Sequence, residues 1–182
     1  MPLEEKYKWL SKEPGPIMIK KALELYDTIE GPGTANNPVI IAWAKEVGGK
    51  VADVYKADQI AWCGLFMAVV AQRSSKQAAK DPLWALNWGT FGKYTDTPML
   101  GDVLVFTRKT ADGKTAGHVG LYVGEDATCY HVLGGNQSDK VCISRKEKIR
   151  LYTSRRPNYN IQPANVRKII LSSSGKISNV EQ

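Results

Sequence analysis

Cysteine is scarce in this chain, and its spacing excludes the architectures that depend on it. The 182 residues contain only Cys63, Cys129 and Cys142, an odd number without the CxxC pairs of structural zinc sites. We therefore expect neither a disulfide scaffold nor a structural metal. Cys129 and Cys142 lie in apparent strands, where a small buried thiol is more common than a bridge.

Long apolar runs and cofactor-binding patterns are also missing. No stretch approaches the roughly 18 apolar residues needed to cross a bilayer, and a start containing Glu4, Glu5 and Lys6 lacks the apolar core of a secretion signal. GxGxxG, Walker and HExxH patterns are absent. The sequence thus predicts no transmembrane segment, no cofactor and no metal, in a protein made in the cytoplasm without a signal peptide.

The composition that remains is typical of one globular domain, expected to be a monomer, with an uneven charge. Hydrophobic residues make up 43% of the chain, and the formal net charge is +7. Residues 140–177 hold ten basic side chains against Glu147 alone. Such a one-sided region attracts polyanions over a long range, although a merely solvated surface explains it equally well.

The first half of the chain has the pattern of helices. Residues 17–30 carry apolar side chains at helical spacing. Asn37 as a cap and Pro38 at the first helical position start a second helix, which Gly48 ends. A third helix begins near Cys63, with Asp58 as a candidate cap, and a fourth is predicted over 77–88.

The second half has the pattern of strands, and the two halves together predict an α+β fold. Short connections between strands favour antiparallel pairing, and helices followed by strands favour a helical layer packed on one sheet face. We divide the chain into an N-terminal extension (1–16), one domain (17–157) and a basic, polar tail (158–182). The β-rich runs are 101–108, 118–124, 128–134, 140–144 and 149–155.

Cys63 and His118 are the candidate catalytic pair. Cys63 stands at the expected start of an apolar helix, where the helix dipole and a nearby imidazolium lower a thiol pKa. His118 opens a strand, and Gly120 leaves space on the same strand face. A thiolate attacking an amide, with a histidine as acid and base, is standard nucleophilic catalysis. Alone, each residue is more often a core thiol or a structural histidine.

A third side chain should hold the imidazole in its working tautomer. Asn136, in Gly134-Gly135-Asn136-Gln137, is the first candidate, although Asn beside glycines is often a turn residue. His131 on the preceding strand is the alternative. Sequence alternation does not decide between them across an uncertain turn.

These motifs resemble a known family. WCGLF, GDVLVF, GHVGLYVG and LGGNQSDKV are similar to the cysteine, histidine-dependent amidohydrolase/peptidase (CHAP) and NlpC-type peptidoglycan hydrolases over about residues 18–157. The resemblance implies a papain-like α+β fold with Cys63 as nucleophile and His118 as base. CHAP-like proteins would use Asn136 as the third member and NlpC-like ones His131, and GGNQ favours Asn136.

The resemblance predicts a bacteriolytic, endolysin-like enzyme with bacterial peptidoglycan as its partner. Either stem-peptide endopeptidase or N-acetylmuramoyl-L-alanine amidase activity fits the same thiol chemistry. A holin, phage tail or secretion system would deliver it to the wall, and its basic half would contact anionic envelope polymers. The rival hypothesis is a catalytically silent module that binds cell wall or nucleic acid, although no stacking-aromatic motif supports nucleic acid.

Several neighbours of the pair are candidates for supporting roles. Four aromatic residues are expected to line a substrate groove or to pack in the core, and core packing is expected for at least two of them. Asp58 and Gln59 precede the nucleophile and would support it, unless Asp58 simply caps a helix. The four aromatic residues are Trp62, Trp84, Trp88 and Tyr94.

Overall fold

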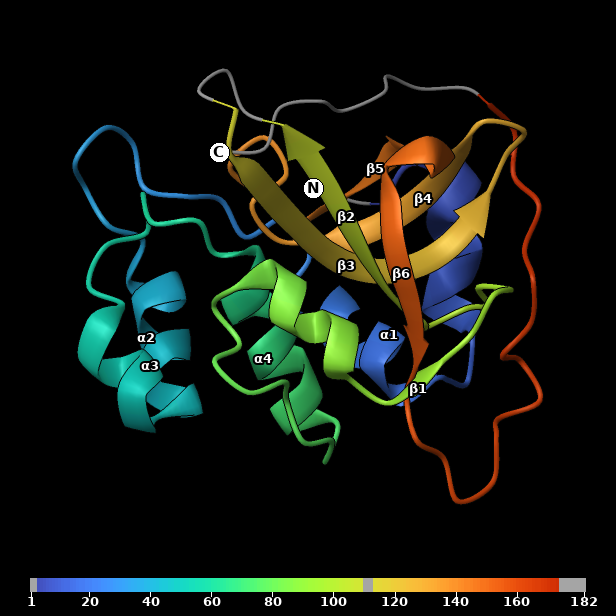
Figure 1. Cartoon of the computed structure of the whole chain (residues 1–182), viewed down its shortest axis with the longest axis horizontal. Coiled ribbons are helices and arrows are strands. Elements are labelled where there is room, and N and C mark those ends of the chain that lie inside the picture. The colour runs from blue at the N-terminus through green and yellow to red at the C-terminus, as the bar shows by residue number, and fades with distance from the viewer. Residues whose placement is uncertain (1–2, 110–112, 174–182) are drawn as a thin grey trace.

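The fold is α+β, as predicted. A computed structural model describes residues 3–109 and 113–173, with helices on one side of a curved sheet (Figure 1). The α-helices are α1 (Ile17–Leu23), α2 (Pro38–Val47), α3 (Gly49–Val54) and α4 (Cys63–Arg73), and the 3-10 helices are η1 (Glu5–Lys12), η2 (Ala85–Thr90) and η3 (Lys148–Arg150). The strands are β1 (Lys93–Tyr94), β2 (Val103–Lys109), β3 (Thr115–Glu125), β4 (Cys129–Gly134), β5 (Cys142–Glu147) and β6 (Leu151–Arg156).

The six strands form one sheet in the order β1-β6-β2-β3-β4-β5. Every neighbouring pair is antiparallel. β2 to β5 follow one another as a meander, but β6 returns to pair with β2 instead of β5. This return places the longest strand, β3, near the middle of the sheet.

Local sequence chemistry sets the bounds of α2. The Asn37 side chain accepts a hydrogen bond from Val39 N at 2.8 Å, and Pro38 occupies the first helical position. Gly48, with φ of 75°, ends the helix in a conformation that glycine adopts at no steric cost. The chain then continues directly into α3, which the sequence patterns do not predict.

Two other helix predictions need correction. The helix predicted over 17–30 ends at Leu23, and Asp27 has a φ of 65°. The helix predicted over 77–88 is wrong: the segment runs through bends and turns until η2 begins at Ala85. Pro82 explains this, because proline lacks an N–H and disfavours helical geometry in the residue before it; Asp81 indeed has a φ of 48°.

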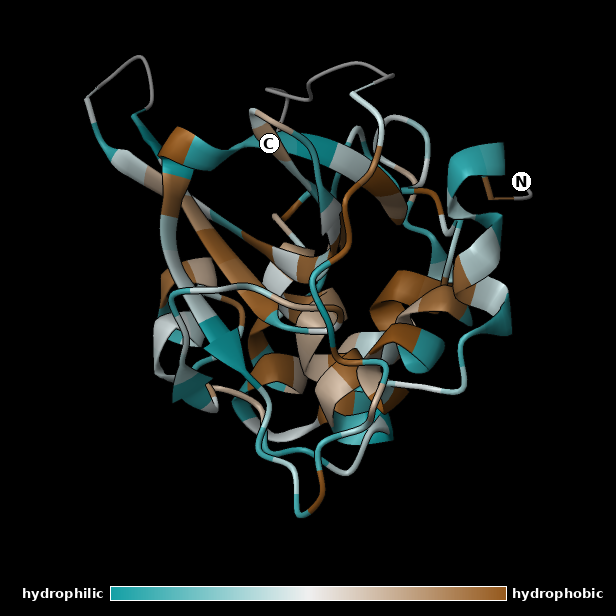
Figure 2. Cartoon of the chain, turned by 90° about the vertical axis from the view of Figure 1, so that its right-hand side faces the viewer, coloured by the Kyte–Doolittle hydropathy of each residue, from teal (hydrophilic) through white to brown (hydrophobic). Residues whose placement is uncertain are grey.

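Helix α4 lies in the centre of the core. All residues from Cys63 to Ala71 are buried, which is typical of a helix that is apolar all round. The β3 residues Val119, Leu121 and Val123 belong to the same core, whereas Tyr122 packs in a smaller cluster on the other sheet face. The predicted alternation along β3 is therefore present. Figure 2 shows apolar segments concentrated in these inner elements and hydrophilic ones in the outer loops.

Described segments on either side of the range predicted for the domain, 17–157, also pack against it. In the N-terminal segment, Tyr7 and Leu10 of η1 are buried in the core. In the C-terminal segment, Arg167 O accepts from Leu100 N at 3.0 Å, and Ile169 O accepts from Glu125 N at 2.9 Å. The last part of the predicted tail, 174–182, lies outside the described residues.

Cys63, Cys129 and Cys142 form no disulfide within the described residues. Cys129 is opposite Glu147 and Cys142 is opposite Gly134, so the two strand cysteines lie at opposite ends of the β4–β5 ladder. A bridge between them is excluded by this separation, because cysteines in a disulfide need Cα atoms within about 7 Å.

Candidate functional site

Cys63 is the first residue of α4 and lies at the edge of a cleft. Its exposed fraction is 6%, and the cleft has a volume of about 290 Å³. The next residue must be glycine, because a Cβ at Gly64 would stand 2.3 Å from the carbonyl oxygen of Pro82. This close approach brings the chain around Leu83 and Trp84 against the start of the helix, where both residues line the cleft with Cys63.

His118 lies on β3, and Gln137 is a hydrogen-bond partner of its ring. His118 Nε2 and Gln137 Oε1 are 3.1 Å apart, and both side chains are buried. Gln137 Nε2 donates to the carbonyl oxygens of Val132 at 3.1 Å and Cys142 at 2.6 Å, which fixes the orientation of the amide. Its oxygen therefore faces the imidazole, and it also accepts from Ser144 Oγ at 2.6 Å.

These bonds determine the tautomer of His118. An amide oxygen only accepts, so the neutral imidazole must carry its hydrogen on Nε2. The basic lone pair is then on Nδ1. This is the tautomer in which an orienting residue holds one ring nitrogen while the other exchanges a proton with a nucleophile.

Asn136 does not occupy the position predicted for it. Its Oδ1 is buried and has no hydrogen-bond partner among residues 3–109 and 113–173, and its φ is 54°, a left-handed conformation that asparagine tolerates. The carboxamide at His118 belongs to the next residue, Gln137. The sequence signal was the same GGNQ motif, in which two consecutive residues carry the same functional group.

His131 lies in a separate buried network and does not meet His118. Its Nδ1 is 2.6 Å from Tyr7 Oη, and its Nε2 is 2.9 Å from Asp126 Oδ2. Arg145 Nε donates to the same carboxylate oxygen at 2.8 Å. Desolvation lowers the pKa of His131, although the bond to Asp126 opposes this. Desolvation would raise the pKa of Asp126, but hydrogen bonds from Arg145 and neighbouring backbone groups hold it well below its usual range.

Strand register explains why the two histidines are apart. β3 and β4 run antiparallel with Leu121 opposite Leu133, and His131 is opposite Gly124. Gly124 is six positions from His118 along β3, a distance of about 20 Å along a strand. The same register brings the turn after β4 level with His118.

Two glycines in that turn connect His118 with the start of α4. A Cβ at Gly134 would lie 3.4 Å from His118 Nε2, and a Cβ at Gly135 would lie 2.7 Å from the Trp62 ring. Trp62 directly precedes Cys63. The cleft beside Cys63 is also lined by Ala116 and Gly117, which lead into His118. The beginnings of α4 and β3 thus border one small cleft, and His118 follows its lining residues along β3.

The four aromatic candidates divide into two pairs. Trp62 and Trp88 are fully buried, which confirms core packing for two of them, whereas Trp84 is 61% exposed and Tyr94 67% exposed. Trp84 lines the Cys63 cleft. Trp62 Nε1 donates to Glu30 Oε2 at 2.9 Å, which holds the residue before the nucleophile.

Asp58 and Gln59 hold a loop and do not cap α4. The buried Asp58 Oδ2 accepts from Gly31 N at 2.8 Å and from Asn37 N at 2.7 Å. Gln59 Nε2 donates to Gly33 O at 3.1 Å. The two residues therefore hold the 31–37 loop against the segment leading to Cys63, and the residue preceding α4 provides no side-chain cap.

Within the described ranges, no group of three or more His, Cys, Asp or Glu side chains is arranged to hold a metal ion. Among the same residues, no helix has the length and apolar character to span a membrane. Comparison with known proteins finds no matching family model, curated protein or solved structure.

Proposed function

We propose that this protein is a papain-like cysteine hydrolase that cleaves an amide bond in the peptide stem of peptidoglycan. The observation that carries the proposal is the bond between His118 Nε2 and Gln137 Oε1. It leaves the basic nitrogen of His118 on Nδ1, and the glycine next to its Nε2 leads into a turn that packs against Trp62 and Phe66, on either side of Cys63 in the chain. Nucleophile, base and orienting carboxamide follow one another in the chain as Cys63, His118 and Gln137.

The reaction follows from these groups. Cys63 Sγ–H transfers its proton to His118 Nδ1, and the thiolate attacks the amide carbon. The imidazolium then protonates the leaving amine as the C–N bond breaks, which leaves a thioester on Cys63. His118 next removes a proton from water, the water oxygen attacks the thioester, and the thiol is restored. Gln137 accepts from Nε2–H throughout, and the N-terminus of the 11-residue α4 favours the thiolate.

Peptidoglycan is proposed as the substrate because of the motif resemblance and the charge distribution. The motifs around Cys63 and His118 resemble those of wall hydrolases, and the basic second half of the chain suits an anionic envelope. Electrostatic attraction of this kind weakens as salt screens it. Wall binding should therefore decrease as the salt concentration rises from low to physiological ionic strength. Binding that is independent of salt would contradict electrostatic attraction between the basic half of the chain and the envelope.

The test is digestion of purified peptidoglycan by the parent protein and by Cys63→Ala, followed by turbidity loss and fragment mass spectrometry. Cys129→Ala is the matched control, because it removes a buried thiol at the end of β4 opposite Glu147, at the other end of the ladder from Cys142 and Gly134. We expect fragments from the parent and from Cys129→Ala, and none from Cys63→Ala. Equal cleavage by Cys63→Ala, or no cleavage of several wall chemotypes by the parent, would refute the proposal and favour a binding module.

A further inference from the structure

The cleft at Cys63 continues into a different surface on each side. On one side it shares Ala61, Leu83 and Trp84 with a pocket of about 690 Å³. On the other side it shares Thr115 with a groove of about 470 Å³. The candidate nucleophile therefore lies between two flanking sites, and their chemistry restricts what is bonded to either side of the scissile amide.

The larger pocket is apolar and aromatic. Val54, Ile60 and Trp84 line it and have exposed fractions of 60%, 46% and 61%. Lys50 and Asp81 are its only charged lining residues within the described chain. Exposed apolar surface of this kind marks a binding site, and an exposed indole offers a broad face with a polar edge. An uncharged group with an apolar face, such as a pyranose ring, matches this pocket.

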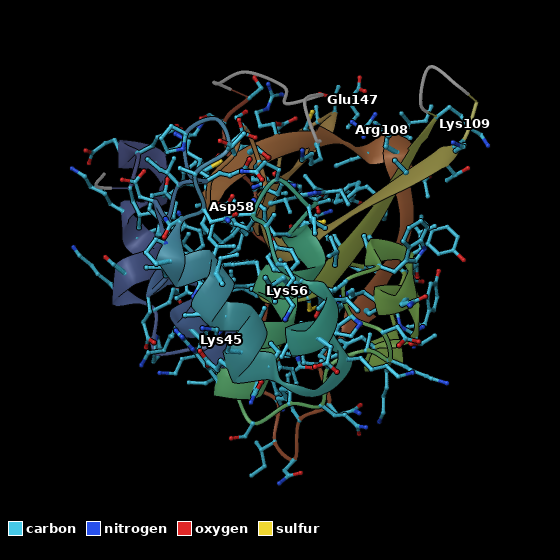
Figure 3. The ribbon with its side chains drawn as sticks, turned by 90° about the vertical axis from the view of Figure 1, so that its left-hand side faces the viewer. Lys45, Lys56, Asp58, Arg108, Lys109 and Glu147 are labelled. Atoms are coloured by element: carbon cyan, nitrogen blue, oxygen red, sulfur yellow. The ribbon has the colours of Figure 1, made fainter. Side chains whose placement is uncertain are left out.

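The opposite groove is cationic. Arg108, Lys109 and Arg150 line it, and none of its described lining residues is acidic. Lys109 Nζ donates to the neutral Thr115 Oγ1 at 2.9 Å, which leaves the lysine charge in place. Figure 3 shows Arg108 and Lys109 at the end of β2, away from Lys45 and Lys56 on the helical side. Such a groove favours carboxylates.

We propose, resting on the proposed function, that the substrate lies across the cleft with a sugar over Trp84 and an anionic peptide toward Lys109. The scissile amide then joins an uncharged sugar-derived acyl group to a peptide that carries carboxylates. In peptidoglycan this is the bond between the muramoyl lactyl group and the first alanine of the stem. The protein is accordingly an N-acetylmuramoyl-L-alanine amidase, because an endopeptidase would need to accept charged peptide on both sides.

The first test identifies the bond from the fragments that the parent protein releases. Stem peptides with a free N-terminal alanine, together with glycan that lacks peptide, would support the inference. Disaccharides that retain alanine, released in a Cys63-dependent reaction, would overturn the inference and leave the thiol hydrolase in place. Absence of Cys63-dependent cleavage would instead overturn the proposed function.

The second test measures binding without turnover, using full-length Cys63→Ala and two probes, a muramoyl tripeptide and the same tripeptide without the sugar. We expect the sugar to strengthen binding about tenfold and Trp84→Ala to abolish that difference. Tyr94→Ala, which removes an equally exposed aromatic side chain outside the three sites, should preserve it. Equal affinity for the two probes, or no affinity for either, would refute the assignment of the sugar.

The charge on the peptide side is tested with the same muramoyl probe, with its carboxylates free or amidated. Lys109→Gln with Arg150→Gln should weaken binding of the free acid about two- to fivefold for each charge and leave the amidated probe unchanged. Lys45→Gln with Lys56→Gln is the matched control, and it should change neither. An equal loss for both pairs of variants, or for both probes, would indicate general electrostatic attraction and refute a dedicated groove.

Discussion

The two histidines of this chain lie on neighbouring strands of one sheet but in opposite chemical environments. His118 meets an uncharged carboxamide and lies next to Gly134, before the turn that packs on Trp62. His131 is enclosed by Tyr7 and by the Asp126–Arg145 ion pair. A neutral partner orients an imidazole without fixing its charge, whereas the ion pair and the tyrosine hydroxyl satisfy both nitrogens of a neutral ring. The first environment permits proton transfer, and the second one stabilises the fold.

The sharpest test of this contrast compares His118→Ala with His131→Ala. We expect His118→Ala to lower kcat/KM on peptidoglycan about a thousandfold or more, far beyond any loss of folded protein caused by truncating this buried side chain. His131→Ala should cost about 2 to 4 kcal/mol of unfolding free energy, because it leaves buried polar groups of Tyr7 and Asp126 unpaired, while folded molecules keep their activity. Urea unfolding measures the free energy of unfolding, and reaction rates corrected for the folded fraction measure the activity. Equal loss of activity in the two variants would contradict the division of roles.

A smaller effect distinguishes Gln137 from Asn136. Gln137→Ala should lower kcat about ten- to a hundredfold and alter the pH profile of kcat/KM, because the His118 ring loses its orienting acceptor. Asn136→Gly keeps the left-handed backbone conformation, since glycine adopts a φ of 54° without strain, and it should keep near-parent activity. The pH profile separates loss of positioning from loss of folding. Inactive Asn136→Gly together with an active Gln137→Ala would restore the role predicted for Asn136.

The buried His131 predicts a pH dependence of stability. Desolvation lowers the pKa of His131 in the folded protein below its value in the unfolded chain, which is about 6.5. At any pH between these two pKa values, the unfolded chain binds more protons than the folded protein. Stability should therefore fall as pH decreases below about 6.5, by up to about 1 kcal/mol per pH unit. Urea midpoints at pH 7.5 and 5.5 measure the loss. His131→Gln should be less stable overall but less sensitive to pH, and equal sensitivity would show that another group is responsible.

The smallest effects concern the hydroxyl groups at the two sites. Ser144→Ala removes a donor to Gln137 Oε1 and should lower kcat about two- to threefold with little loss of stability. Tyr7→Phe removes the hydroxyl at His131 Nδ1 and should cost about 1 kcal/mol of stability with kcat unchanged. Stability and rate are measured together for both variants. If Ser144→Ala and Tyr7→Phe changed kcat and stability in the same way, the hydrogen-bond networks of His118 and His131 would not be functionally distinct.

Local sequence patterns predicted the elements whose causes are local. Asn37, Pro38 and Gly48 carry the signals that start and end α2, and all five β-rich runs are strands. The alternation along β3 is visible in the sequence, because side chains on a strand point to alternate faces. The position of Cys63 at a helix start and of His118 on a strand also follows from such patterns.

The remaining features depend on contacts between distant segments. Pairing of β6 with β2, burial of Tyr7 in the core and packing of residues 167–171 beside Glu125 join parts of the chain far apart in sequence. No local pattern encodes such contacts, because many segments could supply an apolar side chain or a strand edge. The helix predicted over 77–88 failed for a local reason, since Pro82 outweighs its apolar spacing.

By itself, the sequence determined the α+β class and the candidate pair of Cys63 and His118. Only the tertiary structure decided which side chain meets His118. Asn136, Gln137 and His131 are all within reach along the chain, and the choice among them depends on strand register and on the left-handed turn at Asn136. A hydrogen bond requires positions correct to within about half an ångström, and backbone geometry sets such positions only when the whole sheet has formed.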